Sequence, residues 1–252
     1  MQAFARETRL SETTFVQTAS ADGADYRNRI FMTTAELPFA GHPSVGTAVA
    51  VALARGDTDV RYLQQTGAGL QPVEVRIADG RLRGSILQEP ATFGPEVDPA
   101  QALAAVGLAP EDRGPHHFVP QVVSTGLPQL IVPVQRRALK RVIPDADAIA
   151  EVLRPHGAVC IYVAAWEPGT GEAHARSFFL DVQGVTEDPA TGSAAGPFMA
   201  YLFQRNGMRA VDIEQGVEMG RPSLLRCGFD EEEERVRVGG EVVVVAEGTV
   251  YL

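Results

Sequence analysis

The feature that most constrains the fold of this chain is a motif that occurs once in each half. The two copies are ELPFAGHPSVGTAVAVALARG at residues 36–56 and EDPATGSAAGPFMAYLFQRNG at residues 187–207. Each copy runs from an acidic residue through a proline and a glycine-containing turn into a long stretch of small and apolar residues. Each closes on a basic residue and a glycine. The recurrence of one such unit predicts two similar domains.

Each copy of the motif predicts a central helix. The apolar runs at 43–55 and 192–205 leave almost no polar face, so both helices are expected to be buried. Pro43 suits a first helical turn, and Gly56 and Gly207 suit the positions just after a helix. β-Branched or alternating stretches predict strands at 13–18, 26–34 and 159–165, among others. Together these elements predict an α/β (α+β) fold.

The polar stretch from Ala109 to Pro115 predicts the boundary between the domains. We therefore expect one domain over 1–108 and a second over 117–242, with a C-terminal strand at about 243–252 as a candidate to return to the first. The chain has 252 residues, of which 45% are apolar, and this is enough to give each domain a core.

The charge balance and the apolar runs exclude several classes of protein. A net charge of −10 disfavours a nucleic-acid partner, which requires clustered Lys and Arg. No apolar stretch approaches the roughly 18 residues of a membrane span, and the N-terminus is polar and charged, so a cytoplasmic protein is expected. Cys160 and Cys227 each lie in an apolar run, and we expect two buried thiols and no metal site.

The two glycine-containing turns are candidate anion sites. A helix N-terminus offers unpaired backbone N–H groups and the positive end of the helix dipole, and small residues let a ligand approach closely. The turn from Thr191 to Ala195, with Gly192 and the Ser193 hydroxyl, can hold a carboxylate on these grounds, and so can Gly41 with His42. Ordinary tight turns with glycine and serine caps remain the alternative.

Titratable residues lie next to both turns. His42 follows Gly41 directly, and Asp188 precedes the second turn; Glu12, after Ser11, lies between a predicted helix and a predicted strand. Taken singly, they also fit a loop histidine, a helix-capping acid and a surface acid. Together they supply the acid and base that proton transfer beside a carboxylate requires. For such work the pKa of Glu12 is expected to be raised by partial burial.

Four blocks of the sequence resemble the PhzF-like phenazine-biosynthesis family. They are LSETTFV (10–16), ELPFAGHPSVGTA (36–48), EDPATGSAAGP (187–197) and QGVEMGRPS (215–223), and STGLPQLIVPV (124–134) fits the middle region of that family. The blocks span almost the whole chain in the same order as in the family.

The resemblance implies a diaminopimelate-epimerase-like fold, with two similar domains that each wrap a curled mixed sheet around a central helix, and a site between them. It also implies a cofactor-independent isomerase that moves a proton on a dihydro-hydroxyanthranilate-like amino or carboxylic acid, and a homodimer. By position in the motifs, the catalytic residues are Glu12, His42 and Asp188. The substrate-binding residues are Ser11, Gly41, Thr191, Gly192 and Ser193.

The chain departs from its relatives in two ways. The family normally begins with a further strand and a Gly-Asn-Pro turn, whereas this sequence starts at the following helix. The related epimerases place a thiol in each domain, whereas Ala40 precedes the first turn here, and Pro189 and Ala190 precede the second. Two-thiol racemisation is therefore disfavoured.

Three functions remain open at the level of sequence. The first is the proton-shuttling isomerase. The second is a thiol-independent epimerase or racemase that uses carboxylate and histidine. The third is a catalytically idle protein of the same fold that binds a small acid. The joint presence of Glu12, His42, Asp188 and Ser193 favours an active enzyme.

Overall fold

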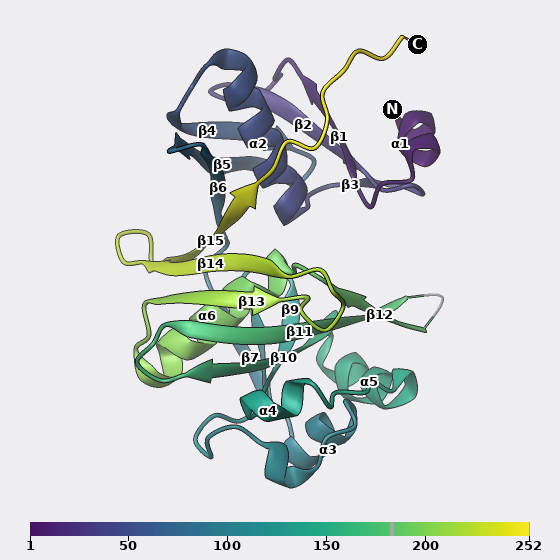
Figure 1. Ribbon diagram of the computed structural model, residues 1–252, viewed down its shortest axis with the longest axis vertical. Coiled ribbons are helices and arrows are strands. Elements are labelled where there is room, and N and C mark those ends of the chain that lie inside the picture. The colour runs from purple at the N-terminus through teal and green to yellow at the C-terminus, as the bar shows by residue number, and fades with distance from the viewer. Residues whose placement is uncertain (182–183, 252) are drawn as a thin grey trace. The chain divides into compact units, whose positions relative to one another are not determined.

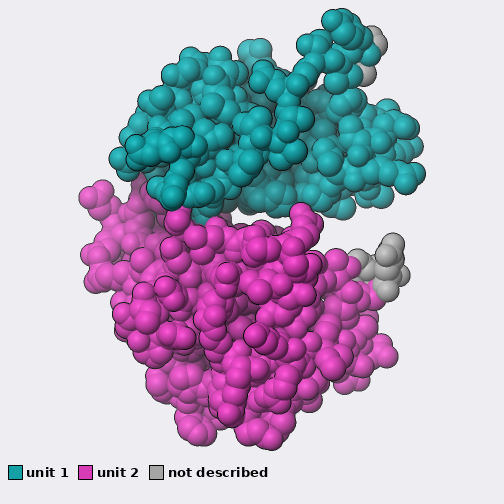
Figure 2. Space-filling view, in the orientation of Figure 1, with its two compact units in different colours: residues 1–87, 239–252 teal, residues 88–238 magenta. Residues whose placement is uncertain are grey.

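The computed structural model describes residues 1–181 and 184–251. The chain divides into two compact units, coloured separately in Figure 2. Unit 1 consists of Met1–Leu87 with Gly239–Leu252, and unit 2 of Gln88–Val238. Each unit contains its own central helix (Figure 1), and one strand, β15 (Arg235–Val242), begins in unit 2 and ends in unit 1. Among the described residues, no helix has the length and apolar character needed to cross a membrane.

Unit 1 is built on a mixed sheet. Its strand order is β1 (Thr13–Gln17), β2 (Tyr26–Phe31), β4 (Asp59–Thr66), β5 (Gly69–Ala78) and β6 (Arg81–Leu87), with β3 (Glu36–Leu37) paired to β2. The β2–β4 pair is parallel and the others are antiparallel. A short helix, α1 (Gln2–Thr8), precedes β1 and ends at Arg9, which adopts a left-handed conformation.

The central helix of unit 1 is α2 (Gly41–Arg55), and the helix predicted at 43–55 is confirmed. It packs on β5 and β6, where Ala48, Val49 and Ala52 join a core with Val73 and other apolar residues. The expected burial holds for the side of the helix that faces the sheet, whereas the opposite side is open, with Leu53 44% exposed. Gly56 follows the helix at φ 78°, in the left-handed region that favours glycine.

Unit 2 has a larger sheet that is covered on both faces. Its strand order is β15 (Arg235–Val242), β14 (Ser223–Asp230), β13 (Ala210–Gln215), β11 (Glu172–Asp181), β10 (Cys160–Glu167), β9 (Pro128–Pro133), β8 (Gln121–Ser124) and β7 (Thr92–Glu96), and β12 (Gly184–Asp188) pairs with β11. Alternate residues of β10 enter two different cores: Tyr162 packs on one face, and Ile161 and Val163 on the other. This alternation follows from the two-residue period of a strand.

The central helix of unit 2 is α6 (Gly192–Asn206), which confirms the second predicted helix. Every residue from Ala194 to Leu202 is buried, and Phe198 and Tyr201 pack with the strands of one face. The other face of the sheet is covered by three short helices, α3 (Pro99–Ala104), α4 (Arg136–Leu139) and α5 (Ala146–Leu153).

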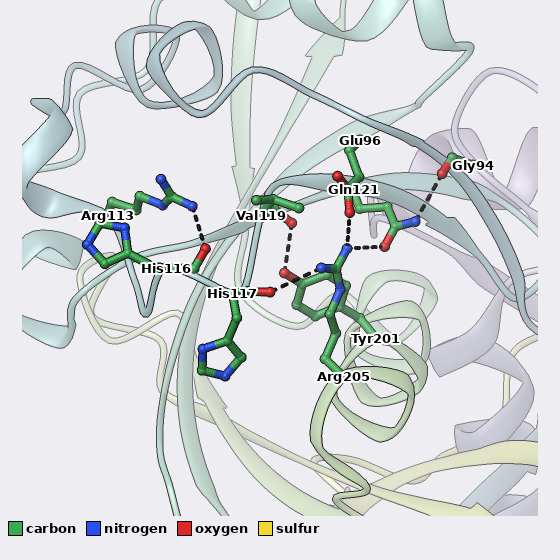
Figure 3. Close-up of polar contacts among 9 residues, drawn as sticks. All are labelled: Gly94, Glu96, Arg113, His116, His117, Val119, Gln121, Tyr201 and Arg205. Atoms are coloured by element: carbon green, nitrogen blue, oxygen red, sulfur yellow. Dashed lines mark hydrogen bonds and ion pairs between the residues drawn. The ribbon is translucent and has the colours of Figure 1, made fainter.

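The carboxyl end of α6 is fixed by a polar network (Figure 3). The Arg205 guanidinium donates to Glu96 Oε1 at 2.6 Å, to Gln121 Oε1 at 3.0 Å and to the His117 carbonyl. Gln121 in turn donates to the Gly94 carbonyl, and the Tyr201 hydroxyl donates to the Val119 carbonyl at 2.7 Å. These bonds anchor the last turns of the helix to β7 and β8.

The division between the units lies earlier than the sequence suggested. We expected a linker at 109–115, but the units separate between Leu87 and Gln88. The expected linker is folded into unit 2, because Asp112 is 1% exposed and is ion-paired with Arg141. β7 pairs with β8, which also places residues 92–96 in unit 2.

The C-terminal segment differs from its prediction as well. Residues 239–252 belong to unit 1, but the strand that reaches them is the end of β15, and residues 243–251 form no strand. Valine-rich sequence favours strands only where a neighbour supplies backbone partners, and Val245 and Tyr251 are each 92% exposed.

Candidate functional site

The predicted site residues fall into two groups, one in each unit. In unit 1, Glu12 lies between α1 and β1, and His42 lies in the first turn of α2. Glu12 Oε2 is 2.9 Å from His42 Nε2. The Glu12 side chain is 17% exposed, whereas that of His42 is 63% exposed. The structure therefore brings together two of the three predicted catalytic side chains.

A hydroxyl pair ties these two elements together. The hydroxyl of Thr47, one turn further along α2, is hydrogen-bonded to the hydroxyl of Thr14 in β1, with 2.8 Å between the two oxygens. This contact fixes the start of β1 against α2, and Glu12 lies just before that strand. This pair could not be predicted from the sequence, because two threonines 33 positions apart carry no local signal.

The pKa of the Glu12 carboxyl is held below its ordinary value of 4.5. The hydrogen bond with His42 is the largest cause, burial opposes it, and a hydrogen bond with Ser11 lowers the pKa further. The expectation of a raised Glu12 pKa is therefore wrong. Burial does act in the expected direction, but the contacts that favour the charged carboxylate outweigh it.

In unit 2, Asp188 ends β12, and Thr191 stands just before the first residue of α6. Asp188 Oδ2 accepts a hydrogen bond from Thr191 Oγ1 at 2.7 Å, and Oδ1 accepts one from the Ala190 N–H. Both donors lie before Gly192, the first residue of α6, so Asp188 holds the turn that precedes the helix and does not cap the helix itself. The structure also brings Asp188, Thr191, Gly192 and Ser193 onto one turn.

The donors of this turn are fewer than expected. The N–H groups of Ala194 and Ala195 both donate to the Thr191 carbonyl, and both residues are fully buried. The first N–H groups of a helix have no intrahelical partner, so Gly192 and Ser193 are the positions left to bind an anion. Both are partly exposed. The candidate positions for an anion are therefore Gly192 and Ser193, and no longer the whole of Thr191–Ala195.

The glycines of the two turns are not required by the packing of the protein. A Cβ at Gly41 would lie 3.7 Å from Ile86 Cδ1, and one at Gly192 would lie 3.8 Å from Val238 Cγ1, both ordinary contacts. Neither residue has a positive φ. The absence of a side chain there suits close approach by a ligand.

A buried amide supports the start of α6. Gln88 donates from Nε2 to the Gly192 carbonyl at 2.9 Å and accepts from the Thr125 hydroxyl. A Cβ at Gly196 would lie 1.7 Å from Gln88 Oε1, so this glycine is required for Gln88 to lie across the helix. Gln88 was not among the residues predicted from the sequence.

Both cysteines are buried and free, as expected. Burial raises the pKa of the Cys160 thiol to about 12, and it raises the pKa of Cys227 as well. Cys160 contacts Gln129 and Ser177 and lies at neither turn. These thiols are therefore part of the core and are not proton-transfer groups.

Comparison with known proteins identifies the family. The family model described as phenazine biosynthesis-like protein matches residues 1–248. This chain belongs to that family. A trans-2,3-dihydro-3-hydroxyanthranilate isomerase of Pseudomonas aeruginosa is 37% identical over 266 residues, covering 100% of this chain and 88% of that protein.

Solved structures agree with this assignment. A protein described as a predicted epimerase from Pseudomonas aeruginosa is 32% identical, with a TM-score of 0.80, covering 100% of this chain and 88% of that one. A hydroxyproline epimerase from Agrobacterium vitis shares the fold alone, at 12% identity and a TM-score of 0.61, with coverage of 91% and 71%. The epimerase-like fold expected from the sequence is confirmed.

Proposed function

We propose that this protein is an isomerase that moves a proton on a small amino or carboxylic acid resembling trans-2,3-dihydro-3-hydroxyanthranilate. The observation that carries the proposal is the Glu12–His42 pair at the start of α2, in a family whose curated relatives are isomerases. The carboxylate of Glu12 is the proton acceptor, and no cofactor takes part.

The chemistry needs one group that removes and returns a proton. Glu12 takes a proton from a substrate carbon, and the electron pair left on that carbon is delocalised into the adjacent unsaturated system. The protonated Glu12 then gives the proton to a different carbon, so the substrate is isomerised and the enzyme is restored. The lowered pKa of Glu12 keeps it as the carboxylate at neutral pH, ready for the first step.

The remaining site residues bind and orient the substrate in this proposal. Gly192 and Ser193 bind its carboxylate through their N–H groups and the positive end of the α6 dipole. His42 and Asp188 contact its polar substituents and assist the transfer.

The test is proton exchange with solvent. The wild-type protein is incubated with trans-2,3-dihydro-3-hydroxyanthranilate in deuterated water, and mass spectrometry follows the incorporation of deuterium. Glu12→Gln is expected to lower the rate by about 10²–10⁴-fold, the usual loss when one acid–base group is removed. The control is Glu7→Gln, an exposed acid of the neighbouring helix α1, which is expected to keep the wild-type rate.

The same experiment separates the other two functions. With chiral α-amino acids as substrates in place of this acid, exchange at the α-carbon with inversion of configuration identifies a racemase. Binding of the acid with neither deuterium incorporation nor formation of the isomer in the wild type identifies an idle binding protein. Full exchange in Glu12→Gln contradicts the assignment of Glu12 as the base.

A further inference from the structure

We infer that Gln215 is a positioning residue that holds the Asp188–Ser193 turn in its binding geometry. The inference rests on the proposed function of that turn. Gln215 is the last residue of β13, and it is fully buried. It cannot touch a substrate itself, so any effect on the reaction passes through the turn.

The nitrogen and the oxygen of the Gln215 side-chain amide both form hydrogen bonds with the turn. Nε2 donates to the Asp188 carbonyl at 2.6 Å and to Thr191 Oγ1 at 2.9 Å. Oε1 accepts from the Thr191 N–H at 3.3 Å. Asp188 and Thr191 are thereby fixed relative to each other from the buried side of the turn.

The partners define the orientation of this amide. If the amide were reversed, the Nε2 donor would face the Thr191 N–H, which is also a donor. The Oε1 acceptor would then face the Asp188 carbonyl, which is also an acceptor. The Tyr162 hydroxyl reinforces the observed orientation, since it donates to Oε1 at 3.1 Å from within the core. One arrangement of the amide therefore satisfies all of these groups.

The amide also orients the Asp188 carboxylate. The Thr191 hydroxyl has one hydrogen, and because its oxygen accepts from Gln215 Nε2, that hydrogen is free to point at Asp188 Oδ2, 2.7 Å away. The chain of contacts from Tyr162 through Gln215 and Thr191 ends on the carboxylate that the proposed mechanism uses. Loss of Gln215 would release both the backbone and the carboxylate of the turn.

The first unit supplies a matched control. Gln64 follows Gly56 by eight positions, as Gln215 follows Gly207, and both glutamines are fully buried. Gln64 Oε1 accepts from Asn28 Nδ2 at 3.1 Å and from the Tyr26 hydroxyl at 3.5 Å, and Nε2 donates to Gln71. Its hydrogen bonds thus join side chains of the sheet, whereas those of Gln215 reach the turn before the helix.

The experiment compares Gln215→Met with Gln64→Met in the full chain. The first readout is hydrogen–deuterium exchange of the amides at 188–195, which needs no substrate. Gln215→Met is expected to accelerate exchange at this turn by about 10-fold. The substitution removes all of the hydrogen bonds that the Gln215 amide makes to the turn, and together these bonds are strong enough to account for a change of this size. Gln64→Met is expected to leave exchange there unchanged.

The second readout is the isomerisation itself. Gln215→Met is expected to lower kcat/KM by about 10²-fold, the scale of a displacement near 1 Å in a positioned group, mainly through a higher KM. Gln64→Met is expected to stay near the wild-type value. Should Gln215→Met fail to fold, Tyr162→Phe removes one hydrogen bond to the same amide and is expected to act in the same direction, with Tyr26→Phe as its control.

The outcomes distinguish this inference from the proposed function. Equal exchange at 188–195 in Gln215→Met and wild type overturns the positioning role, and so does a loosened turn with unchanged KM. A wild-type protein that does not isomerise the acid contradicts the proposed function alone, because the exchange comparison still reports whether Gln215 holds the turn.

Discussion

At the scale of single residues, the Glu12–His42 pair decides the protonation state of the proposed base. Burial alone would raise the pKa of Glu12, but the hydrogen bond from His42 lowers it below 4.5. A lowered carboxyl pKa gives stability that is present above the unfolded-state pKa and is lost as the pH falls through the folded one. The proposed base acts only as the carboxylate, so kcat/KM falls when Glu12 is protonated. In the wild type this fall at acid pH, the acid limb of the pH profile, is expected below about pH 4.5.

His42→Ala is expected to move this limb to higher pH. The variant removes the largest lowering contact while the burial of Glu12 remains, so the pKa of Glu12 rises. Deuterium incorporation measured as a function of pH checks the shift, and the exposed His116 supplies the control His116→Ala. An acid limb at the same pH in wild type and His42→Ala would show that His42 does not set the charge of Glu12.

Glu12, His42 and Gln215 show which features of the site could be predicted from the sequence and which could not. Glu12 and His42 were found because each lies in a short motif, and the structure brings them within 2.9 Å. The direction of the Glu12 pKa shift was predicted wrongly, because burial and hydrogen bonding act in opposite directions and only the folded structure shows which is larger. Gln215 was missed as a functional residue because its partners lie 24 and 27 positions away.

At the scale of elements, the two central helices begin differently. α6 carries Gly196 where a Cβ would overlap Gln88, whereas a Cβ at Gly46 in α2 would meet nothing within 4 Å. Gly196→Ala is expected to destabilise the protein by about 1–3 kcal/mol, the cost of overpacking a filled site. Gly46→Ala is expected to stabilise it by about 0.5–1 kcal/mol, since alanine favours a helix interior. Denaturant unfolding measures both, and destabilisation by both variants alike would contradict the packing described for Gln88.

The elements themselves were largely predictable. The motif at 36–56 and 187–207 specified two apolar helices, and both are found with the glycine just after the last turn. The boundary of the units could not be found in the same way. The polar stretch at 109–115 resembles a linker, but the burial of Asp112 depends on Arg141, whose approach only the tertiary fold determines. The strand predicted at 243–252 failed for a related reason, because its sequence is suited to a strand but strand formation requires a partner.

At the scale of the whole molecule, we expect a homodimer, as the family resemblance implies. The exposed apolar residues of the C-terminal segment, Val243, Val244, Val245, Val250 and Tyr251, are 53–92% exposed. Clustered apolar surface of this kind is typical of contact sites. Light scattering at micromolar concentration is expected to give twice the 27.0 kDa of one chain. A mass of 27.0 kDa would contradict the dimer.

The last prediction concerns how many substrate molecules one chain binds. The proposed function assigns Glu12 and His42 of unit 1 and Asp188 and Ser193 of unit 2 to the same substrate. Glu12→Gln is expected to bind the acid and to turn it over about 10²–10⁴-fold more slowly, so calorimetry with this variant can measure binding. We expect one molecule of acid for each chain.

Asp188→Asn, added to Glu12→Gln, then tests whether the second unit shares that molecule. The affinity is expected to fall by about 10-fold or more, since a hydrogen bond to a charged group contributes about 1.5–3 kcal/mol. Asp147→Asn, at an exposed acid of α5, is the control and is expected to leave the affinity unchanged. Two independent molecules for each chain, or an affinity that does not respond to Asp188→Asn, would mean that each unit binds for itself. In that case the repeated helix and turn would have been kept for folding, and the proton transfer would belong to the Glu12–His42 pair alone.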